Sequence, residues 1–168
     1  MTPDHPIATA PELSVVVPAF NEAEGINAFL ERLAGILRGC CSAFEIWVID
    51  DGSRDATWEQ LRTAQRHLPE LRGVRFTRNF GKEAAILAGL RQAQGRAVIV
   101  MDADGQHPPG LLPQMLTLWR DGSAQIVAAQ KVARDGDGWR ARLHHRDRDG
   151  AGALASHGGV LDAPRRGA

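Results

Sequence analysis

The stretch Leu13-Ser-Val-Val-Val-Pro-Ala-Phe-Asn-Glu22 decides the fold of this chain. Its first half is a continuous apolar and β-branched run, typical of a strand buried on both faces of a sheet. Pro18 lacks a backbone N–H, so a strand that ends there leaves the hydrogen-bonded ladder. Asn21 and Glu22 then precede a helical pattern, and one ordinary interpretation of them is capping of the first helical turn, where negative charge is favourable.

Helical and strand patterns alternate after this first strand. Apolar residues recur at three- and four-residue spacing from Ile26 to Leu37, which indicates one stripe of an amphipathic helix that Gly39 can stop. Further strands are predicted at 44–49, 73–77, 97–101 and 124–129, and further helices after Asp55, over 82–94 and over 109–120. Strands separated by helices of this length predict crossover connections, and hence an α/β fold with a mostly parallel sheet and helices on both faces.

Composition limits the classes of function. The chain has 168 residues, enough for one domain, and its 20 Lys and Arg balance its 20 Asp and Glu. This balance gives no electrostatic support for a nucleic-acid partner, and we expect none. Its cysteines, Cys40 and Cys41, are adjacent and fit ordinary thiols in a reducing compartment.

No sequence feature suggests export or membrane insertion. No apolar run reaches the ~20 residues of a membrane helix, and residues 1–11 lack the pattern of a signal peptide. We therefore expect a cytoplasmic protein, at most peripheral at the inner face of the membrane.

Hydrophobic patterning stops after about Arg134. We expect a disordered N-terminal extension over 1–12, one folded domain over 13–138, and a disordered or frameshifted tail over 139–168. The tail is rich in Gly, Asp, Arg and His, and its histidines lack the spacing of a metal site.

An acidic pair follows the predicted strand at 97–101. Asp102 and Asp104 point the same way along an extended segment, and Gln106 continues the alternation. Two carboxylates so placed repel each other unless a cation lies nearby, and their hard oxygens suit Mg²⁺ or Mn²⁺. A metal there could neutralise the charge that builds on a departing diphosphate. Taken alone, the tripeptide also fits a solvated acidic turn.

Two more polar clusters follow predicted strands. Asp50-Asp-Gly-Ser53 can accept hydrogen bonds from a base or a ribose, although an Asx turn with a helix cap also explains it. Arg78-Asn-Phe-Gly-Lys-Glu83 offers cations and helix-start amides to an anion, or is an ordinary surface turn. With the clusters at 18–22 and 102–106, four polar groups end four successive parallel strands. Because ligands of such sheets bind beyond the carboxyl ends of the strands, we expect the four groups to meet at one rim.

Together these segments resemble the successive motifs of family 2 glycosyltransferases with the GT-A fold. The resemblance rests on the order and spacing of four segments, 15–22, 48–53, 78–83 and 101–108. The Asp-Ala-Asp-Gly-Gln-His-Pro and Asn-Phe-Gly-Lys forms are similar in particular to the polyprenyl-phosphate branch, that of enzymes like dolichyl-phosphate mannose synthase. The similarity covers about residues 13 to 138.

The resemblance implies a role for each matching position. The residues that would bind the nucleotide sugar are Pro18, Ala19, Glu22, Asp50, Asp51, Lys82 and Asp102. Within this set, Asp51 would contact the base and Asp50 would support its loop. Asp102 and Asp104 would be the catalytic carboxylates. Asp104 and Gln106 would hold Mg²⁺ or Mn²⁺ on the diphosphate.

The implied reaction transfers a sugar from a nucleotide diphosphate donor to a polyprenyl phosphate, dolichyl or undecaprenyl, at the membrane surface, with inversion at the anomeric carbon. A phosphate acceptor is anionic near neutral pH and requires no dedicated general base. Members of this branch continue with an acceptor-side helix and an Arg-containing segment, neither of which is recognisable here. We therefore expect a gene truncated or frameshifted after about Leu143, and the alternative function is a catalytically inactive remnant that binds nucleotide and metal.

Two other enzyme classes fit less well. A phosphatase with an Asp-x-Asp nucleophile would carry that pair after its first strand, whereas here it follows the fourth. A dinucleotide oxidoreductase requires Gly-x-Gly-x-x-Gly after the first strand, and residues 18–22 contain no glycine.

Overall fold

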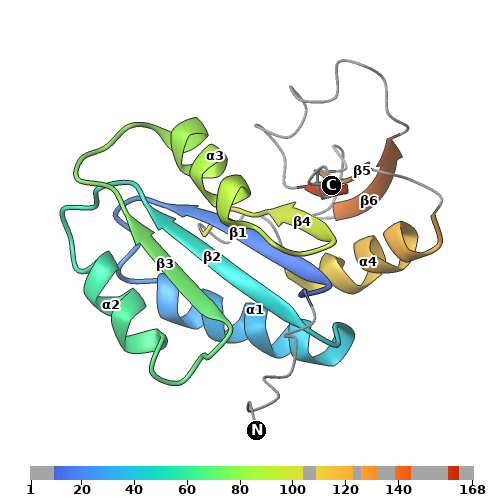
Figure 1. The fold of residues 1–168 in the computed structure, drawn as a ribbon, viewed down its shortest axis with the longest axis horizontal. Coiled ribbons are helices and arrows are strands. Elements are labelled where there is room, and N and C mark those ends of the chain that lie inside the picture. The colour runs from blue at the N-terminus through green and yellow to red at the C-terminus, as the bar shows by residue number, and fades with distance from the viewer. Residues whose placement is uncertain (1–9, 104–108, 123–125, 132–138, 145–158, 163–168) are drawn as a thin grey trace, which may run out of the picture.

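Within its described residues, the chain forms one seven-stranded sheet flanked by helices (Figure 1). The computed structural model describes residues 10–103, 109–122, 126–131, 139–144 and 159–162, the last three ranges through their backbone alone. The strands are β1 (Leu13–Ala19), β2 (Phe44–Asp50), β3 (Leu71–Arg75), β4 (Ala97–Val100), β5 (Ile126–Lys131), β6 (Trp139–His144) and β7 (Gly159–Asp162). The helices are α1 (Ile26–Cys40), α2 (Thr57–Ala64), α3 (Lys82–Gln92), the 3₁₀ turn η1 (Pro109–Leu111) and α4 (Leu112–Arg120).

The strands lie in the order β3-β2-β1-β4-β7-β5-β6. The first four are parallel to one another. β7 runs antiparallel between β4 and β5, so β5 points the same way as β4, and β6 is antiparallel to β5. The expected α/β fold with a mostly parallel sheet is confirmed.

β1 lies at the centre of the parallel part because both of its faces are covered. Val15 and Val17 are fully buried against α1, α2 and α4. Val16 is fully buried on the opposite face, where it packs against α3. Figure 1 shows α3 on one side of the sheet, and α1 and α2 on the other. Burial on both faces explains why this strand is a continuous apolar run rather than an alternating pattern.

α1 packs one apolar face on the sheet, as the spacing of its apolar residues predicts. Its buried residues are Ile26, Phe29, Leu30, Leu33, Ala34 and Leu37. They form the apolar stripe expected of a helix that packs one face on a sheet. Each large aliphatic side chain buried in this way stabilises the fold by roughly 1.5–3 kcal/mol. α1 therefore fixes the position of the loop that leads into it from β1.

Parallel pairing brings the carboxyl ends of the central strands to one edge. Ala19 pairs with Asp50, and Asp50 pairs in turn with Arg75. The Met101 amide donates to the carbonyl of Val16 at 3.0 Å, which extends the β1–β4 ladder past the end of β4. The segments that follow β1, β2 and β4 therefore start side by side.

The structure corrects the expected domain limits at both ends. β6 and β7 lie in the region 139–168, where we expected no secondary structure. Trp139-Arg-Ala-Arg-Leu-His144 alternates apolar and polar residues with a period of two, which suits an antiparallel strand and is missed by a search for buried runs and helical stripes. At the other end, Pro11 and Glu12 already exchange backbone hydrogen bonds with Arg96, Ala97 and Ala43.

Two smaller differences concern element limits. Among the described residues the fifth strand covers Ile126–Lys131 rather than ending at 129, and residues 124 and 125, where we expected it to begin, lie outside the described part of the chain. The third strand covers Leu71–Arg75 rather than 73–77.

Among the described residues, no helix combines the length and the apolar character needed to span a bilayer.

Candidate functional site

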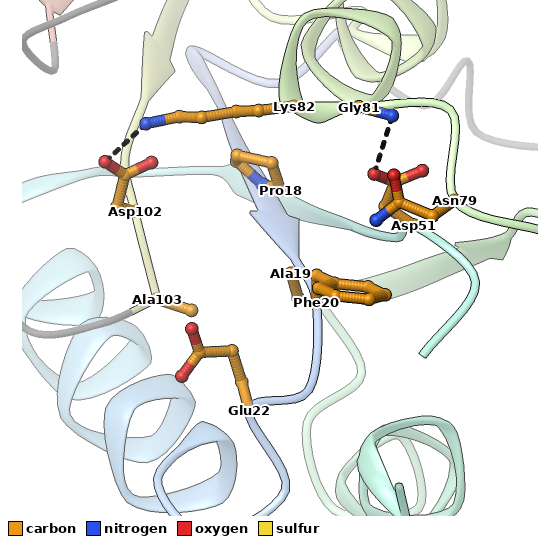
Figure 2. Close-up of a pocket in the computed structure, with 10 residues that line it drawn as sticks. All are labelled: Pro18, Ala19, Phe20, Glu22, Asp51, Asn79, Gly81, Lys82, Asp102 and Ala103. Atoms are coloured by element: carbon orange, nitrogen blue, oxygen red, sulfur yellow. Dashed lines mark hydrogen bonds and ion pairs between the residues drawn. The ribbon is translucent and has the colours of Figure 1, made fainter. Parts of the chain in front are cut away.

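A pocket of about 280 Å³ opens at the carboxyl edge of the parallel strands (Figure 2). Its volume is close to the lower end of the range for small-molecule sites, about 300–1,000 Å³. The described residues that line it are Pro18, Ala19, Phe20, Glu22, Asp51, Asn79, Gly81, Lys82, Asp102 and Ala103. They come from the end of β1 and from the segments that follow β1, β2, β3 and β4, which is the convergence that the strand order predicts.

Asp51 holds the segment before α3 in place. Its Oδ1 accepts a hydrogen bond from the Phe80 amide at 2.7 Å, and its Oδ2 accepts one from the Gly81 amide at 2.9 Å. The side chain is almost fully buried, and the Asp51 amide donates to the carbonyl of Ala19 at 2.9 Å. A carboxylate with two backbone donors fixes geometry strongly, because each such charge-assisted bond is worth more than a neutral one. Asp51 therefore links the ends of β1 and β2 to the start of α3.

The loop after β1 is tied to the loop after β2 by side-chain hydrogen bonds. The Asn21 amide donates to Ser53 Oγ at 2.9 Å, and the Glu22 amide donates to Thr57 Oγ1 at 2.9 Å. In return, the Arg54 amide donates to Asn21 Oδ1 at 2.9 Å. Asn21 has a φ of +56°, a left-handed conformation that asparagine tolerates better than most residues. These bonds place Glu22 at the pocket wall.

Asp55 completes this loop-to-loop connection. Its Oδ2 accepts a hydrogen bond from the Ala23 amide at 3.1 Å, and its Oδ1 accepts one from the Thr57 amide at 3.0 Å, the first residue of α2. Desolvation tends to raise the pKa of this carboxyl, but the hydrogen bonds from Thr57 and Ala23 outweigh it and leave the pKa below its ordinary value. Asp55 therefore serves both the start of α2 and the loop after β1.

Lys82 and Asp102 form an ion pair at the pocket. The ammonium nitrogen Nζ of Lys82 lies 2.7 Å from Oδ2 of Asp102. Lys82 is the first residue of α3, and Asp102 follows β4, so the pair bridges two elements (Figure 2). The carboxylates of Glu22 and Asp51 line the same pocket. The pocket thus offers mainly anionic oxygen acceptors with one cation among the described residues that line it.

The described donor set is compatible with a divalent metal ion at Asp102. An oxygen ligand suits Mg²⁺ or Mn²⁺, and the ammonium of Lys82 already shows that this carboxylate position favours a positive charge. Within the described residues, no cluster of three or more His, Cys, Asp or Glu side chains could hold a metal by itself. The other expected ligands, Asp104 and Gln106, lie outside the described residues.

Six of the expected site residues line the pocket: Pro18, Ala19, Glu22, Asp51, Lys82 and Asp102. Asp50 does not; it is fully buried beneath the loop, where its Oδ1 accepts a hydrogen bond from the Ser53 amide at 2.9 Å. Its Oδ2 lies 3.3 Å from Nε of Arg75, an ion pair without hydrogen-bond geometry. Asp50 therefore supports the loop from below, and it does not line the pocket with the other expected nucleotide-binding residues.

The structure adds four lining residues that we did not expect: Phe20, Asn79, Gly81 and Ala103. Phe20 is 40% exposed, an unusual state for a large aromatic side chain, and its place inside the first motif could have identified it. Asn79 and Gly81 lie inside the segment 78–83, whose cations and helix-start amides we expected to meet an anion, but neither residue was singled out there. Ala103 carries no chemical signal that sequence reasoning could have used.

Comparison with known proteins supplies the family. The model of "Glycosyl transferase family 2" matches residues 14–162. An uncharacterized glycosyltransferase of Synechocystis is 40% identical over 128 residues, which cover 76% of this chain and 40% of that protein. A bactoprenol glucosyl transferase of Shigella phage SfV is 37% identical and covers 80% of this chain and 46% of its own length. A dolichol-phosphate mannosyltransferase of Pyrococcus furiosus is 33% identical over a region that covers 72% of this chain and 34% of that protein.

Solved structures show the same fold. Glucosyl-3-phosphoglycerate synthase from Mycobacterium tuberculosis, solved with Mn²⁺, UDP and phosphoglyceric acid, is 25% identical with a TM-score of 0.56 and covers 69% of this chain and 42% of its own. A mannosyltransferase from Pyrobaculum calidifontis, solved with GDP-Man and Mn²⁺, is 23% identical with a TM-score of 0.64. The match covers 92% of this chain and 45% of that protein. The chain spans less than half the length of the curated relatives named above. The family match, the strand order and the site at the carboxyl edge agree: the chain belongs to glycosyl transferase family 2.

Proposed function

We propose that this chain carries the donor-binding part of an inverting glycosyltransferase that moves a sugar from a nucleotide diphosphate sugar to a polyprenyl phosphate. The observation that carries the proposal is the pocket at the carboxyl edge, where Glu22, Asp51 and Asp102 converge from the segments after three parallel strands. In open α/β sheets this edge is where ligands bind. The sequence motifs on the same edge support a nucleotide sugar as the ligand.

The relatives support a lipid phosphate as the acceptor. A bactoprenol glucosyl transferase, an undecaprenyl-phosphate 4-deoxy-4-formamido-L-arabinose transferase and a dolichol-phosphate mannosyltransferase are 37%, 36% and 33% identical to this chain. Their names differ in the sugar but share a polyprenyl acceptor. The acceptor class is therefore the property that these relatives hold in common, and it supports a reaction at a membrane surface.

The donor would lie along the pocket between the β1 loop and the start of α3. Asp51 would accept hydrogen bonds from the base or the ribose with the lone pairs that its two amide donors leave over. Pro18 and Ala19 form the apolar floor, and Phe20 offers an exposed ring beside it. The diphosphate would then face Lys82 and Asp102.

Asp102, together with Asp104 and Gln106 of the same motif, would hold Mg²⁺ or Mn²⁺. Bound there, the ion would neutralise charge on the departing diphosphate. The chain's own residues would orient the donor and add one cation, Lys82, at the same place. Because the acceptor phosphate is already anionic near neutral pH, alignment of the two substrates contributes more than proton removal.

Calorimetric titration with UDP and GDP, with and without Mn²⁺, tests donor binding and identifies the base. We expect one nucleotide to bind in the presence of metal, and Asp102→Ala to weaken that binding by more than about tenfold, or ~1.4 kcal/mol. Asp121→Ala is the matched control. Asp121 follows Arg120, which pairs with Glu12 just before β1 at the opposite edge of the sheet, so this variant should bind as the parent does.

Transfer of radiolabelled sugar from UDP- or GDP-sugar to undecaprenyl or dolichyl phosphate in detergent then tests the reaction. Labelled lipid supports the full proposal. Metal-dependent nucleotide binding without labelled lipid would instead support a domain that binds nucleotide and metal without turnover. If the folded protein binds neither UDP nor GDP, both the transferase and the domain that only binds nucleotide and metal are contradicted.

A further inference from the structure

Lys82 stands out among the residues of the pocket because it neutralises the carboxylate that a metal would use. Its Nζ lies 2.7 Å from Oδ2 of Asp102, within charge-assisted hydrogen-bond distance. The side chain of Lys82 is 47% exposed and that of Asp102 is 21% exposed. An ion pair with this much solvent contact is weak, and the ammonium can exchange its partner for another.

The backbone of Lys82 is held far more firmly than its ammonium group. The two residues before it, Phe80 and Gly81, donate their amides to the buried carboxylate of Asp51. The carbonyl of Gly81 accepts the Ala85 amide at 3.2 Å, which starts α3. The four-carbon stem of lysine then lets the ammonium reorient from a fixed base. Lys82 can therefore leave Asp102 without any rearrangement of the fold.

We propose that Lys82 is an internal counter-ion that occupies Asp102 in the empty pocket and transfers to the donor diphosphate when nucleotide and metal bind together. The inference rests on the proposed function, because it assigns the order of events at the same site. A divalent ion that binds alone must displace the Lys82 ammonium from Asp102, and the displaced ammonium then stays close to the ion and repels it. A metal–nucleotide pair offers the ammonium a new anionic partner, the diphosphate.

Two binding properties follow. Metal alone binds weakly, because Lys82 competes for Asp102 and repels the ion. Metal and nucleotide bind cooperatively, because each relieves the charge that the other leaves unbalanced, and this coupling is reciprocal. Lys82 thus prevents a free cation from occupying the site before the donor arrives.

The test compares the full chain with Lys82→Gln, Lys82→Arg and Arg91→Gln. Arg91 lies in the last turn of α3, about 13 Å along the helix from Lys82 at 1.5 Å per residue, so its variant removes the same charge from the same helix away from the pocket. Free Mn²⁺ measured by electron paramagnetic resonance gives the metal affinity with and without the preferred nucleoside diphosphate. Calorimetry gives the nucleotide affinity without metal.

We expect Lys82→Gln to strengthen the binding of Mn²⁺ alone by about three- to tenfold, the range for losing one exposed ion pair and one repulsive charge. The same variant should weaken the nucleotide without metal and reduce the coupling between the two ligands. Arg91→Gln should behave as the parent does, and Lys82→Arg, which keeps the positive charge, should bind Mn²⁺ alone more weakly than Lys82→Gln does. A structural defect would weaken both ligands in Lys82→Gln and would not produce the opposite changes.

The results separate this inference from the proposed function. If Mn²⁺ and nucleotide bind the parent together but Lys82→Gln leaves the affinity for Mn²⁺ alone unchanged or lower, the counter-ion role is wrong and the donor site stands. If the folded parent binds neither nucleotide nor Mn²⁺ under any condition, the proposed function itself fails, and the counter-ion role fails with it.

Discussion

Gly52 lies where two loops of the pocket meet. Its φ is +67°, and a Cβ at this position would come within 2.4 Å of the carbonyl carbon of Arg78. The missing side chain therefore serves two purposes, a left-handed turn and a close approach between the loops after β2 and β3. Asp51, one residue earlier, depends on this approach for its bonds to Phe80 and Gly81.

Gly122 allows these two effects to be separated. Its φ is also +67°, but no atom of the described residues lies within 4 Å of a Cβ built there. We expect Gly122→Ala to lower the free energy of unfolding by about 1 kcal/mol and Gly52→Ala by about 3 kcal/mol, since only the second adds a clash with backbone. Urea unfolding measures both. Equal losses in the two variants would mean that the loops do not approach as described.

Cys41 provides a prediction about pH. Burial, to which the neighbouring Cys40 thiol adds, raises the pKa of Cys41 to about 12. The reactive thiolate is therefore scarce in the folded protein below that pH. In a Cys40→Ala variant at pH 8, we expect Cys41 to react with a disulfide reagent at least about a hundredfold more slowly in the folded than in the unfolded chain. Comparable rates in the two states would contradict the half-buried position of the Cys41 thiol.

At the scale of elements, the β1–α1 loop owes its position to α2 and the loop before it. Thr57, the first residue of α2, is fully buried and accepts the Glu22 amide at 2.9 Å. Its hydroxyl also donates to Asp55. Replacing this hydroxyl by a methyl group leaves a buried amide and a carboxylate with one partner fewer each.

We expect Thr57→Val to lower the free energy of unfolding by about 1–2 kcal/mol and to weaken nucleotide binding, because Glu22 lines the pocket. Thr63→Val is the control, since Thr63 is exposed in the same helix and its hydroxyl donates, among the described contacts, only to the Glu59 carbonyl one turn earlier. Its effect should stay within about 0.5 kcal/mol. If the two variants lose the same stability and Thr57→Val binds nucleotide normally, the loop connection does not position Glu22.

Strong local patterns made some elements predictable from the sequence and left others to tertiary packing. The continuous run of β1 and the stripe of α1 specify buried faces by themselves. α3 does not, because Ala85 and Gly89 are its buried residues, and Gly89 permits contact with Val16 so close that an added Cβ would overlap the valine. The strand β6 was missed because its short alternating pattern becomes a strand only through pairing with β5, which the sequence of β6 alone does not show.

The same division applies to the site. Charged residues at the ends of parallel strands could be placed on one edge because the fold class fixes where those ends lie. The partners of Asp51 could not, because the amides of Phe80 and Gly81 are 29 and 30 residues away and carry no side-chain signal. Asp50 and Asp51 are adjacent, yet one lies beneath the loop and the other lines the pocket, a difference set by strand alternation at the end of β2.

At the scale of the whole molecule, two ion pairs join distant parts of the chain. Glu12, before β1, pairs with Arg120 at the end of α4 through two bonds of 2.8 and 2.9 Å. Arg38 of α1 pairs with Glu70, before β3, in the same two-bond manner. Hydrogen bonds from Arg120 and Arg38, respectively, outweigh desolvation and hold the pKa of Glu12 and of Glu70 below the ordinary glutamate value.

The sign of the pH dependence follows from this direction. A carboxyl whose pKa is lower in the folded state stabilises the fold above the unfolded pKa, and that contribution is lost as pH falls through the folded pKa. We expect the free energy of unfolding to be level near neutral pH and to fall below about pH 4.5. Glu12→Gln should cost about 0.5–1 kcal/mol at pH 7 after solvent screening, and this cost should become smaller as the pH falls through the lowered pKa of Glu12. A cost independent of pH would point to packing instead of charge.

Amide hydrogen exchange shows whether the pocket at the carboxyl edge binds a nucleoside diphosphate. With Mn²⁺ and the nucleotide that binds, we expect slower exchange at residues 20–23 and 79–82, which border the pocket, and unchanged exchange at residues 117–121 near the opposite edge. Binding that leaves 20–23 and 79–82 unprotected while slowing exchange elsewhere would place the nucleotide in a different site and contradict the proposed function.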